Sequence, residues 1–163
     1  MPARPPRSAL APKGTNGPAA PVPSPLVEAL LAECLRVTPR RVLVPLAGQA
    51  VELVEHLSRN RLVLDIAEGD ETQLVKLTRF PVHAAIGQEF ENMEPQAVYD
   101  VVVIGILASL EMVEQARKFL ALGGRVVFLA RADGKLPEDS GSRATAAPGL
   151  DGVAIVVIPN RGA

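Results

Sequence analysis

Short apolar runs alternate along the chain with stretches in which apolar residues recur at the spacing of an amphipathic helix. The apolar runs predict strands at residues 41–44, 62–66, 82–86, 98–106, 125–130 and 153–158. These runs are uniformly apolar rather than alternating, which is typical of strands covered on both faces. The sequence therefore predicts an α/β fold, a three-layer sandwich whose mostly parallel sheet is joined by right-handed helical crossovers.

Helix boundaries are marked by polar residues that can cap the first turn. Ser24 followed by Pro25 is typical of an N-cap and first helical position. Asp70 and Ser109 begin two further helical patterns in the same way. Residues 131–150 are polar and rich in glycine, proline and serine, and we expect them to form a loop.

The N-terminus differs in composition from the rest of the 163 residues. The first 25 residues contain 8 of the 15 prolines and no acidic residue. Too little apolar surface is present there to offset the entropy of ordering. We therefore expect residues 1–23 to be a disordered Pro/Ala-rich basic tail, carrying Arg4, Arg7 and Lys13, and residues 24–163 to form one domain.

Composition excludes several classes of function. The net charge is −1 and the pI about 6.1, so no global basic field favours nucleic acid as a partner. One cysteine, Cys34, and two histidines, His56 and His83, argue against a disulfide framework or a metal site. No apolar run has the length of a membrane span or the pattern of a secretion signal, so we expect a cytoplasmic protein without membrane partners.

Three segments between residues 41 and 130 resemble the class I SAM-dependent methyltransferases. Residues 62–66 resemble the family's second strand, residues 99–103 its fourth, and residues 119–129 the helix end, Gly-Gly turn and fifth strand. This resemblance implies a Rossmann-like sheet in the order 3-2-1-4-5 plus one terminal strand. The family's sheet ends in a hairpin of two strands, whereas here only residues 153–158 are expected to form a strand.

The turn after the first strand departs from the family pattern. The family has an acidic residue followed by three alternating glycines, because any side chain there would keep the backbone from the cofactor. In this chain Gly48 matches one of these glycines. Val44 replaces the acidic residue, Leu46 the first glycine and Ala50 the last. The resemblance thus implies a degenerate cofactor loop, for which we expect no bound cofactor.

Two further positions correspond to contacts with S-adenosylmethionine, if that cofactor is bound. Asp65, with Glu68 nearby, is the expected carboxylate for the ribose hydroxyls, because a charge-assisted bond to both is strong. Gln88 stands where the family prefers an aspartate beside the adenine. The conditional cofactor-binding set is therefore Gly48, Asp65 and Gln88.

No catalytic residue is predicted. The residues after the fourth strand, Ile104 to Ala108, are apolar or glycine, and Ser109 is explained as a helix cap. His83 lies within a strand pattern, where a core or edge role is expected.

Three functions remain open. The first is a non-catalytic methyltransferase-like domain that acts as a protein-binding or scaffold module. Its partner, a protein or a second copy of the chain, would bind at the edge of the terminal strand or in the altered cleft. The alternative is a divergent SAM-dependent methyltransferase acting on a small molecule or a protein. The third is a receiver-like signalling domain, although Val44-Pro45-Leu46 supplies no acid after the first strand.

Overall fold

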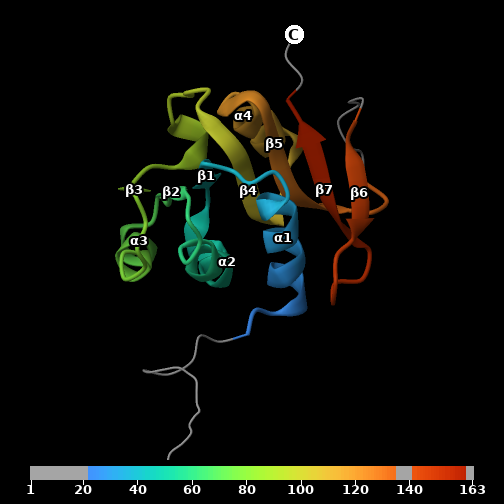
Figure 1. Ribbon diagram of the computed structural model, residues 1–163, viewed down its shortest axis with the longest axis horizontal. Coiled ribbons are helices and arrows are strands. Elements are labelled where there is room, and N and C mark those ends of the chain that lie inside the picture. Colours follow the sequence, from blue (N-terminus) through green and yellow to red (C-terminus); the bar gives the residue numbers. More distant parts are fainter. Residues whose placement is uncertain (1–21, 135–140, 161–163) are drawn as a thin grey trace, which may run out of the picture.

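The computed structural model describes residues 22–134 and 141–160, which form one seven-stranded sheet in the order β3-β2-β1-β4-β5-β7-β6 (Figure 1). Most of the predicted tail, residues 1–21, lies outside the described residues. The strands are β1 Arg41–Val44, β2 Val63–Ala67, β3 Ala84–Ile86, β4 Tyr99–Leu107, β5 Leu120–Arg131, β6 Arg143–Ala146 and β7 Val153–Pro159. Strands β1 to β5 are parallel, and β7 runs antiparallel to both β5 and β6.

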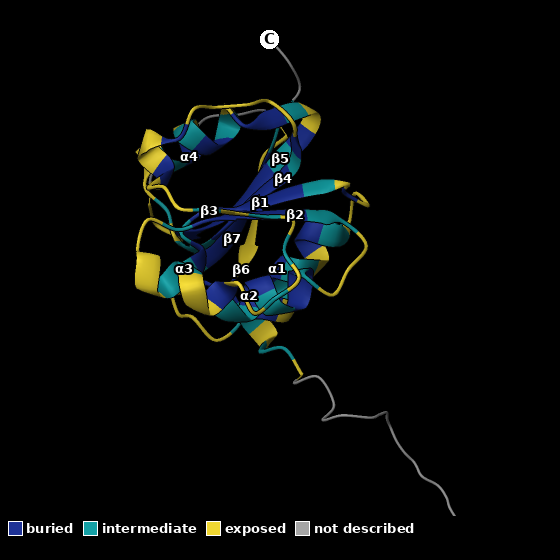
Figure 2. Ribbon diagram, turned by 90° about the vertical axis from the view of Figure 1, so that its left-hand side faces the viewer, coloured by how far each residue is buried: buried dark blue, intermediate teal, exposed yellow. Residues whose placement is uncertain are grey.

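Helices cover both faces of the sheet. The α-helices are α1 Pro25–Leu35, α2 Val51–Leu57, α3 Glu71–Leu77 and α4 Leu110–Arg117, and the short 3-10 helices are η1 Ala47–Gln49 and η2 Phe90–Asn92. Figure 2 shows α1, α2 and α3 on one face and α4 on the other, with the buried strands between them. None of the helices in the described ranges is long and apolar enough to cross a membrane.

Successive side chains along each buried strand point to opposite faces of the sheet, so each strand contributes to two hydrophobic cores. Val42 and Val44 of β1 pack with α1 and α2, whereas Leu43 packs on the opposite face with α4. The predicted three-layer α/β class and the order 3-2-1-4-5 are confirmed. Flavodoxin-like domains, which include receivers, have the order 2-1-3-4-5. The observed order and the antiparallel β7 therefore rule out the receiver-like alternative.

The end of the sheet corrects the sequence prediction. Residues 131–150, expected as a loop, contain β6, so β7 lies between two strands and is not the sheet edge. Strand β6 was missed because it is four residues long and its last three residues are exposed, which leaves no apolar run. Arg143 of β6 donates to Glu33 of α1 over 3.1 Å between Nη1 and Oε2. This ion pair lowers the pKa of Glu33 and ties the hairpin to the helical layer.

The Gly123-Gly124 pair lies inside β5 and not at the end of a helix. Helix α4 already ends at Arg117, and β5 begins at Leu120. The register with β4 shifts between Tyr99 and Val101, opposite the glycine pair. Gly123 has a φ of +84°, a conformation that glycine adopts without a steric cost. The two glycines therefore form a bulge at the start of the strand.

We expect Gly124→Ala to destabilise the domain by about 1–3 kcal/mol, the usual cost of overpacking. The added Cβ would lie 2.8 Å from the carbonyl oxygen of Tyr99 and 3.0 Å from that of Ala121, and backbone atoms in a sheet cannot move aside cheaply. Urea unfolding measures the change. Gly87→Ala is the control, since its Cβ would meet only a flexible leucine side chain at 3.3 Å. Equal stability of the two variants would contradict the bulge assignment.

Candidate functional site

The candidate site lies at the carboxyl edge of the parallel strands, where the strand order reverses between β1 and β4. Ligands of open α/β sheets bind at this position. A cavity of about 390 Å³ opens there, within the roughly 300–1,000 Å³ typical of small-molecule sites. Its lining comes from the segments after β1, β3 and β4 and consists of Leu46, Glu89, Phe90, Glu91, Ser109, Glu111, Met112 and Gln115.

The turn after β1 keeps its shape without the missing glycines. Leu46, at the family's first glycine position, has φ 54° and ψ 39°, which is the left-handed conformation that favours glycine. A leucine held there is strained by about 1–2 kcal/mol. Such strain is concentrated at functional sites in proteins. The backbone therefore turns as a glycine loop would, and the Leu46 side chain forms part of the cavity wall.

Only glycine fits at position 48, because the carboxylate of Glu68 lies directly against its backbone. The backbone N–H of Gly48 donates to Oε1 of Glu68 over 2.7 Å. A Cβ at Gly48 would lie 2.5 Å from that oxygen and 2.8 Å from Cβ of Gln73. The only glycine kept from the family loop is therefore the one that brings Glu68 against the turn.

Glu68 stands directly after β2, half-buried, at the point where the family places its ribose-binding acid. Its second oxygen, Oε2, accepts from the N–H of Asp70 over 2.9 Å. A carboxylate has about four lone-pair positions, so both oxygens of Glu68 retain acceptor capacity. The sequence identified this residue only as a neighbour of Asp65.

Asp65 lies in the middle of β2, away from the carboxyl edge. It is 2 % exposed and pairs in register with Leu43 and Ala84. Its carboxylate accepts from Oη of Tyr99 over 2.7 Å and from Nη2 of Arg41 over 3.0 Å. Because Arg41 and Tyr99 begin their strands, this network faces the amino edge. Asp65 is therefore not brought together with Gly48.

The network keeps Asp65 ionised. Burial favours the neutral acid, but hydrogen bonds from Tyr99, His83 and Arg41 together hold the pKa of Asp65 below its ordinary value. Nδ1 of His83 lies 2.8 Å from Oδ1 of Asp65. The side chain of His83 is 61 % exposed. Burial and the adjacent Asp65 raise the pKa of Tyr99 to about 12, so Tyr99 stays a donor. The arrangement therefore ties β2 to the starts of β1 and β4.

Gln88 follows β3 and is exposed. It lines a second cavity of about 240 Å³ with Ile86, Met93 and Tyr99 among its neighbours. Of the three positions named from the sequence, only Gly48 therefore lies at the turn beside the larger cavity. Ser109 caps α4 by accepting from the N–H of Met112 over 3.2 Å, as predicted. No group of three metal-ligating side chains occurs within the described part of the chain.

Cys34 is expected to be unreactive in the folded protein. Its side chain is fully buried in α1, and desolvation raises the pKa of the thiol to about 12. Thiolate is the reactive form, so alkylation by iodoacetamide at neutral pH should be slower by more than about 100-fold than in the urea-unfolded chain. Mass spectrometry of timed samples measures the two rates. Rapid modification of the native protein would show that the packing of α1 against the sheet does not bury this thiol as described.

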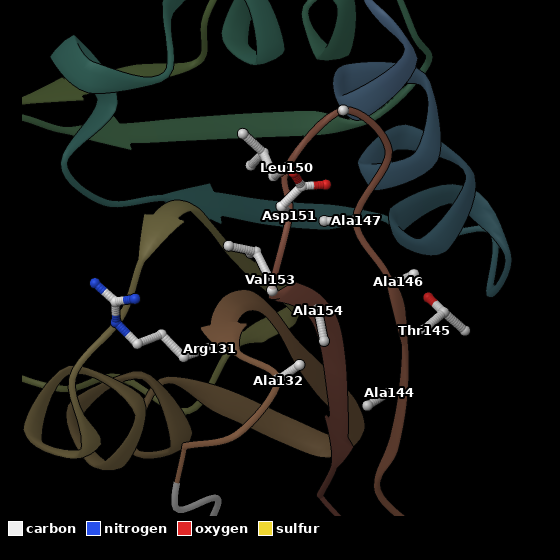
Figure 3. Close-up of a pocket in the computed structure, with 12 residues that line it drawn as sticks. Arg131, Ala132, Ala144, Thr145, Ala146, Ala147, Leu150, Asp151, Val153 and Ala154 are labelled. Carbon is white, nitrogen blue, oxygen red and sulfur yellow. The ribbon is translucent and has the colours of Figure 1, made fainter.

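A further cavity, of about 510 Å³, lies beside the β6–β7 hairpin and has few polar side chains. Figure 3 shows alanines, Leu150 and Val153 in its labelled lining, with Arg131 extending away from them and Asp151 in the turn. Small-molecule sites combine an apolar wall with convergent polar groups. That combination occurs in the 390 Å³ cavity, which we therefore treat as the candidate site.

Solved methyltransferase structures have this fold. The proposed methyltransferase yhhF from Escherichia coli is 16 % identical, with a TM-score of 0.63 over 88 % of this chain and 89 % of that one. The proposed methylase HI0767 from Haemophilus influenzae is 18 % identical, with a TM-score of 0.62 over 83 % and 97 %. The N-methyltransferase NodS from Bradyrhizobium japonicum, in complex with S-adenosyl-L-homocysteine, is 15 % identical, with a TM-score of 0.60 over 83 % and 86 %.

No protein-family model and no curated protein matches the sequence. The comparisons therefore establish the methyltransferase-like fold, with a mostly parallel Rossmann-like sheet.

Proposed function

We propose that the domain binds S-adenosylmethionine at its carboxyl edge and is a divergent SAM-dependent methyltransferase acting on a small molecule or a protein. One observation carries the proposal: the Glu68 carboxylate, at the end of β2, lies against the Gly48 turn on the same edge as the 390 Å³ cavity. This is the place at which the family needs an acid for ribose. NodS, which has the same fold, binds the demethylated form of this cofactor.

The residues present fit this cofactor. Glu68 has free lone pairs for two ribose hydroxyls, and charge-assisted bonds of this kind are strong. Leu46, Phe90 and Met112 offer an apolar wall suited to an adenine ring. The carboxylates of Glu89 and Glu111 suit a positively charged sulfonium. When bound, the cofactor would supply an electrophilic methyl group.

The side chains of this domain would catalyse methyl transfer by positioning the two reactants and by their charge, and not by acid–base chemistry. Leu107, which ends β4, and Ala108, which follows it, have no polar side chain, and the hydroxyl of Ser109 is bonded to the first turn of its helix. Orientation of two reactants alone accounts for a large part of many rate enhancements. We therefore propose an acceptor that is nucleophilic without a dedicated base.

A non-catalytic, protein-binding domain is the second candidate. Two observations favour it. The segment directly after β4 has no polar side chain that could act on an acceptor, and Glu68 already accepts hydrogen bonds from two backbone N–H groups. This function needs no affinity for the cofactor. The two candidates therefore make opposite predictions for one titration.

Isothermal titration of the full chain with S-adenosylmethionine and S-adenosyl-L-homocysteine tests the proposal. We expect saturable binding of one ligand per chain, with a dissociation constant on the order of micromolar, the lower end of common KM values. ATP is the control, because it shares the adenosine but carries phosphates that the acidic lining repels. A folded chain that binds neither SAM nor its product at millimolar concentration would overturn the methyltransferase proposal and favour the non-catalytic domain.

A further inference from the structure

Carboxylates gather at the carboxyl edge of the sheet. The first turns of α1, α2, α3 and α4 all contain an acidic residue there, which each helix dipole favours. The segments after β2 and β3 add three further acids, Glu68, Glu89 and Glu91. Of these, Glu91 lies in the first turn of the short 3-10 helix η2, and the other two lie in no α-helix. The edge is therefore more acidic than helix stability alone explains.

Basic residues gather at the opposite edge. Arg36 and Lys118 follow the ends of α1 and α4, and Arg40 precedes β1. Arg59, Arg61, Lys76, Arg79, Arg117 and Arg125 lie near the same edge. Among the described residues, Arg131 at the end of β5 is the one cation of the carboxyl edge. The carboxyl edge is therefore poor in cations, whereas at the opposite edge acids such as Glu33 and Asp100 contact the basic residues.

The 390 Å³ cavity is the centre of the acidic edge. Glu89, Glu91 and Glu111 line it and are exposed, and no basic side chain is part of the lining. Within residues 22–134 and 141–160, none of the three carboxylates forms an ion pair with a cation. Their field is therefore available to a positively charged group that arrives from outside the described residues.

A basic segment of the same chain is joined to this edge. Residues 1–21 contain Arg4, Arg7 and Lys13 and no acidic residue. They connect to the domain through Val22, which is 88 % exposed. Two residues later the N–H of Ser24 donates to Oε2 of Glu52, in the first turn of α2, over 2.6 Å. Ser24 lines a small cavity with Gln49 and Ala50, so the domain begins beside the turn that contains Gly48.

We infer that the acidic carboxyl edge is a docking surface for a basic peptide segment, and that its occupant is the chain's own residues 1–21. Lys13 precedes Ser24 by eleven residues, which span at most about 36–40 Å when extended. This reach exceeds the radius of gyration of about 14 Å expected for a domain of this size. The segment can therefore place its cations along the whole edge.

Tethering makes such docking effective although exposed ion pairs are individually weak. A segment joined to its own site has an effective concentration on the order of millimolar. Docking should therefore occur in single molecules and weaken as salt screens the charges. The inference goes beyond the proposed function and does not require the cofactor to bind.

Carbodiimide cross-linking of the full chain, without cofactor, tests the inference. This reagent joins an amine directly to a carboxylate, so it reports contact between Lys13 and individual glutamates. We expect cross-links from Lys13 to Glu89, Glu91 or Glu111 at an ionic strength of about 10 mM, where the Debye length is about 30 Å. Their yield should fall at least about tenfold at about 1 M, where that length is about 3 Å.

Matched variants distinguish the acidic edge from acidic residues in general. Glu91→Gln combined with Glu111→Gln should lower the yield several-fold. Glu55→Gln combined with Glu114→Gln, two helix acids that pair with arginines away from the cavity, should leave it unchanged. Mixing isotope-labelled and unlabelled chains separates links within one molecule from links between molecules. Lys13 links that are absent, spread equally to Glu55 and Glu114, or only intermolecular would overturn the inference.

Discussion

Asp65→Ala is expected to destabilise the domain by about 3–5 kcal/mol, the usual cost of removing one partner from a buried charged network. The Tyr99 hydroxyl would lose its acceptor while its side chain stays buried at 5 % exposure. Arg41 would lose the carboxylate that it contacts at 3.0 Å. Urea unfolding followed by circular dichroism measures the change in the free energy of unfolding.

His83→Ala is the control for this effect. The imidazole contacts the same carboxylate but is 61 % exposed, so water can replace it, and a loss of at most about 1 kcal/mol is expected. Equal losses in the two variants would show that Tyr99 and Arg41 do not depend on Asp65 as described.

The contribution of Asp65 also has a defined dependence on pH. Its pKa is lower in the folded protein than in the unfolded chain, where it is about 3.9. Its stabilising effect is therefore present above that unfolded value and is lost as the pH falls through the folded one. The difference in stability between the wild type and Asp65→Asn should be constant near neutral pH and shrink below about pH 4. A difference that grows on acidification would contradict the assigned direction.

Glu68→Gln is expected to weaken the binding of S-adenosylmethionine by about 100-fold, because bonds from hydroxyls to a charged acceptor are worth about 1.5–3 kcal/mol each. The glutamine carbonyl can still accept from the N–H of Gly48, so the turn should be retained. Calorimetric titration measures the affinity, and thermal unfolding verifies that the variant is folded.

Glu71→Gln provides the matched control. Glu71 is a neighbouring exposed acid in the first turn of α3, so its neutralisation changes the net charge of the edge by the same amount. We expect its affinity for the cofactor to stay within about threefold of the wild type, since it contacts neither the turn nor the cavity lining. A similar loss in both variants would indicate a general effect of charge instead of a ribose contact at Glu68.

The sequence was sufficient for most of the sheet because its central strands are covered on both faces. Residues 41–44 were predicted and observed as β1, and Ser24, Asp70 and Ser109 cap their helices as expected. Strand β6 could not be predicted in this way. Its pairing with β7 and its ion pair to α1 are contacts between distant residues, which local hydrophobic periodicity does not report.

The site was harder to predict because a strand end is uncertain by one or two residues in a sequence. The second strand was expected to end at residue 66, which made Asp65 the nearest carboxylate. The observed strand ends at Ala67, so Glu68 is the acid of the carboxyl edge. Gly69-Asp70, a turn signal directly after Glu68, could have indicated this boundary.

Residue types alone predict a degenerate loop after β1. The backbone geometry shows that the loop nevertheless keeps the turn of a glycine loop. Leu46 adopts the left-handed conformation at the position where the family has a glycine. Loss of that glycine therefore did not remove the turn. Only the side chains of Leu46 and Ala50, and not the path of the backbone, therefore distinguish this turn from a glycine loop.

Cofactor binding at Glu68 is best tested by a crystal structure of the full chain grown with S-adenosyl-L-homocysteine. We expect the adenosine in the cavity lined by Leu46, Phe90 and Met112, with the ribose hydroxyls on Glu68 and no contact to Asp65. An empty cavity at saturating ligand, or a ribose held by Asp65, would contradict it.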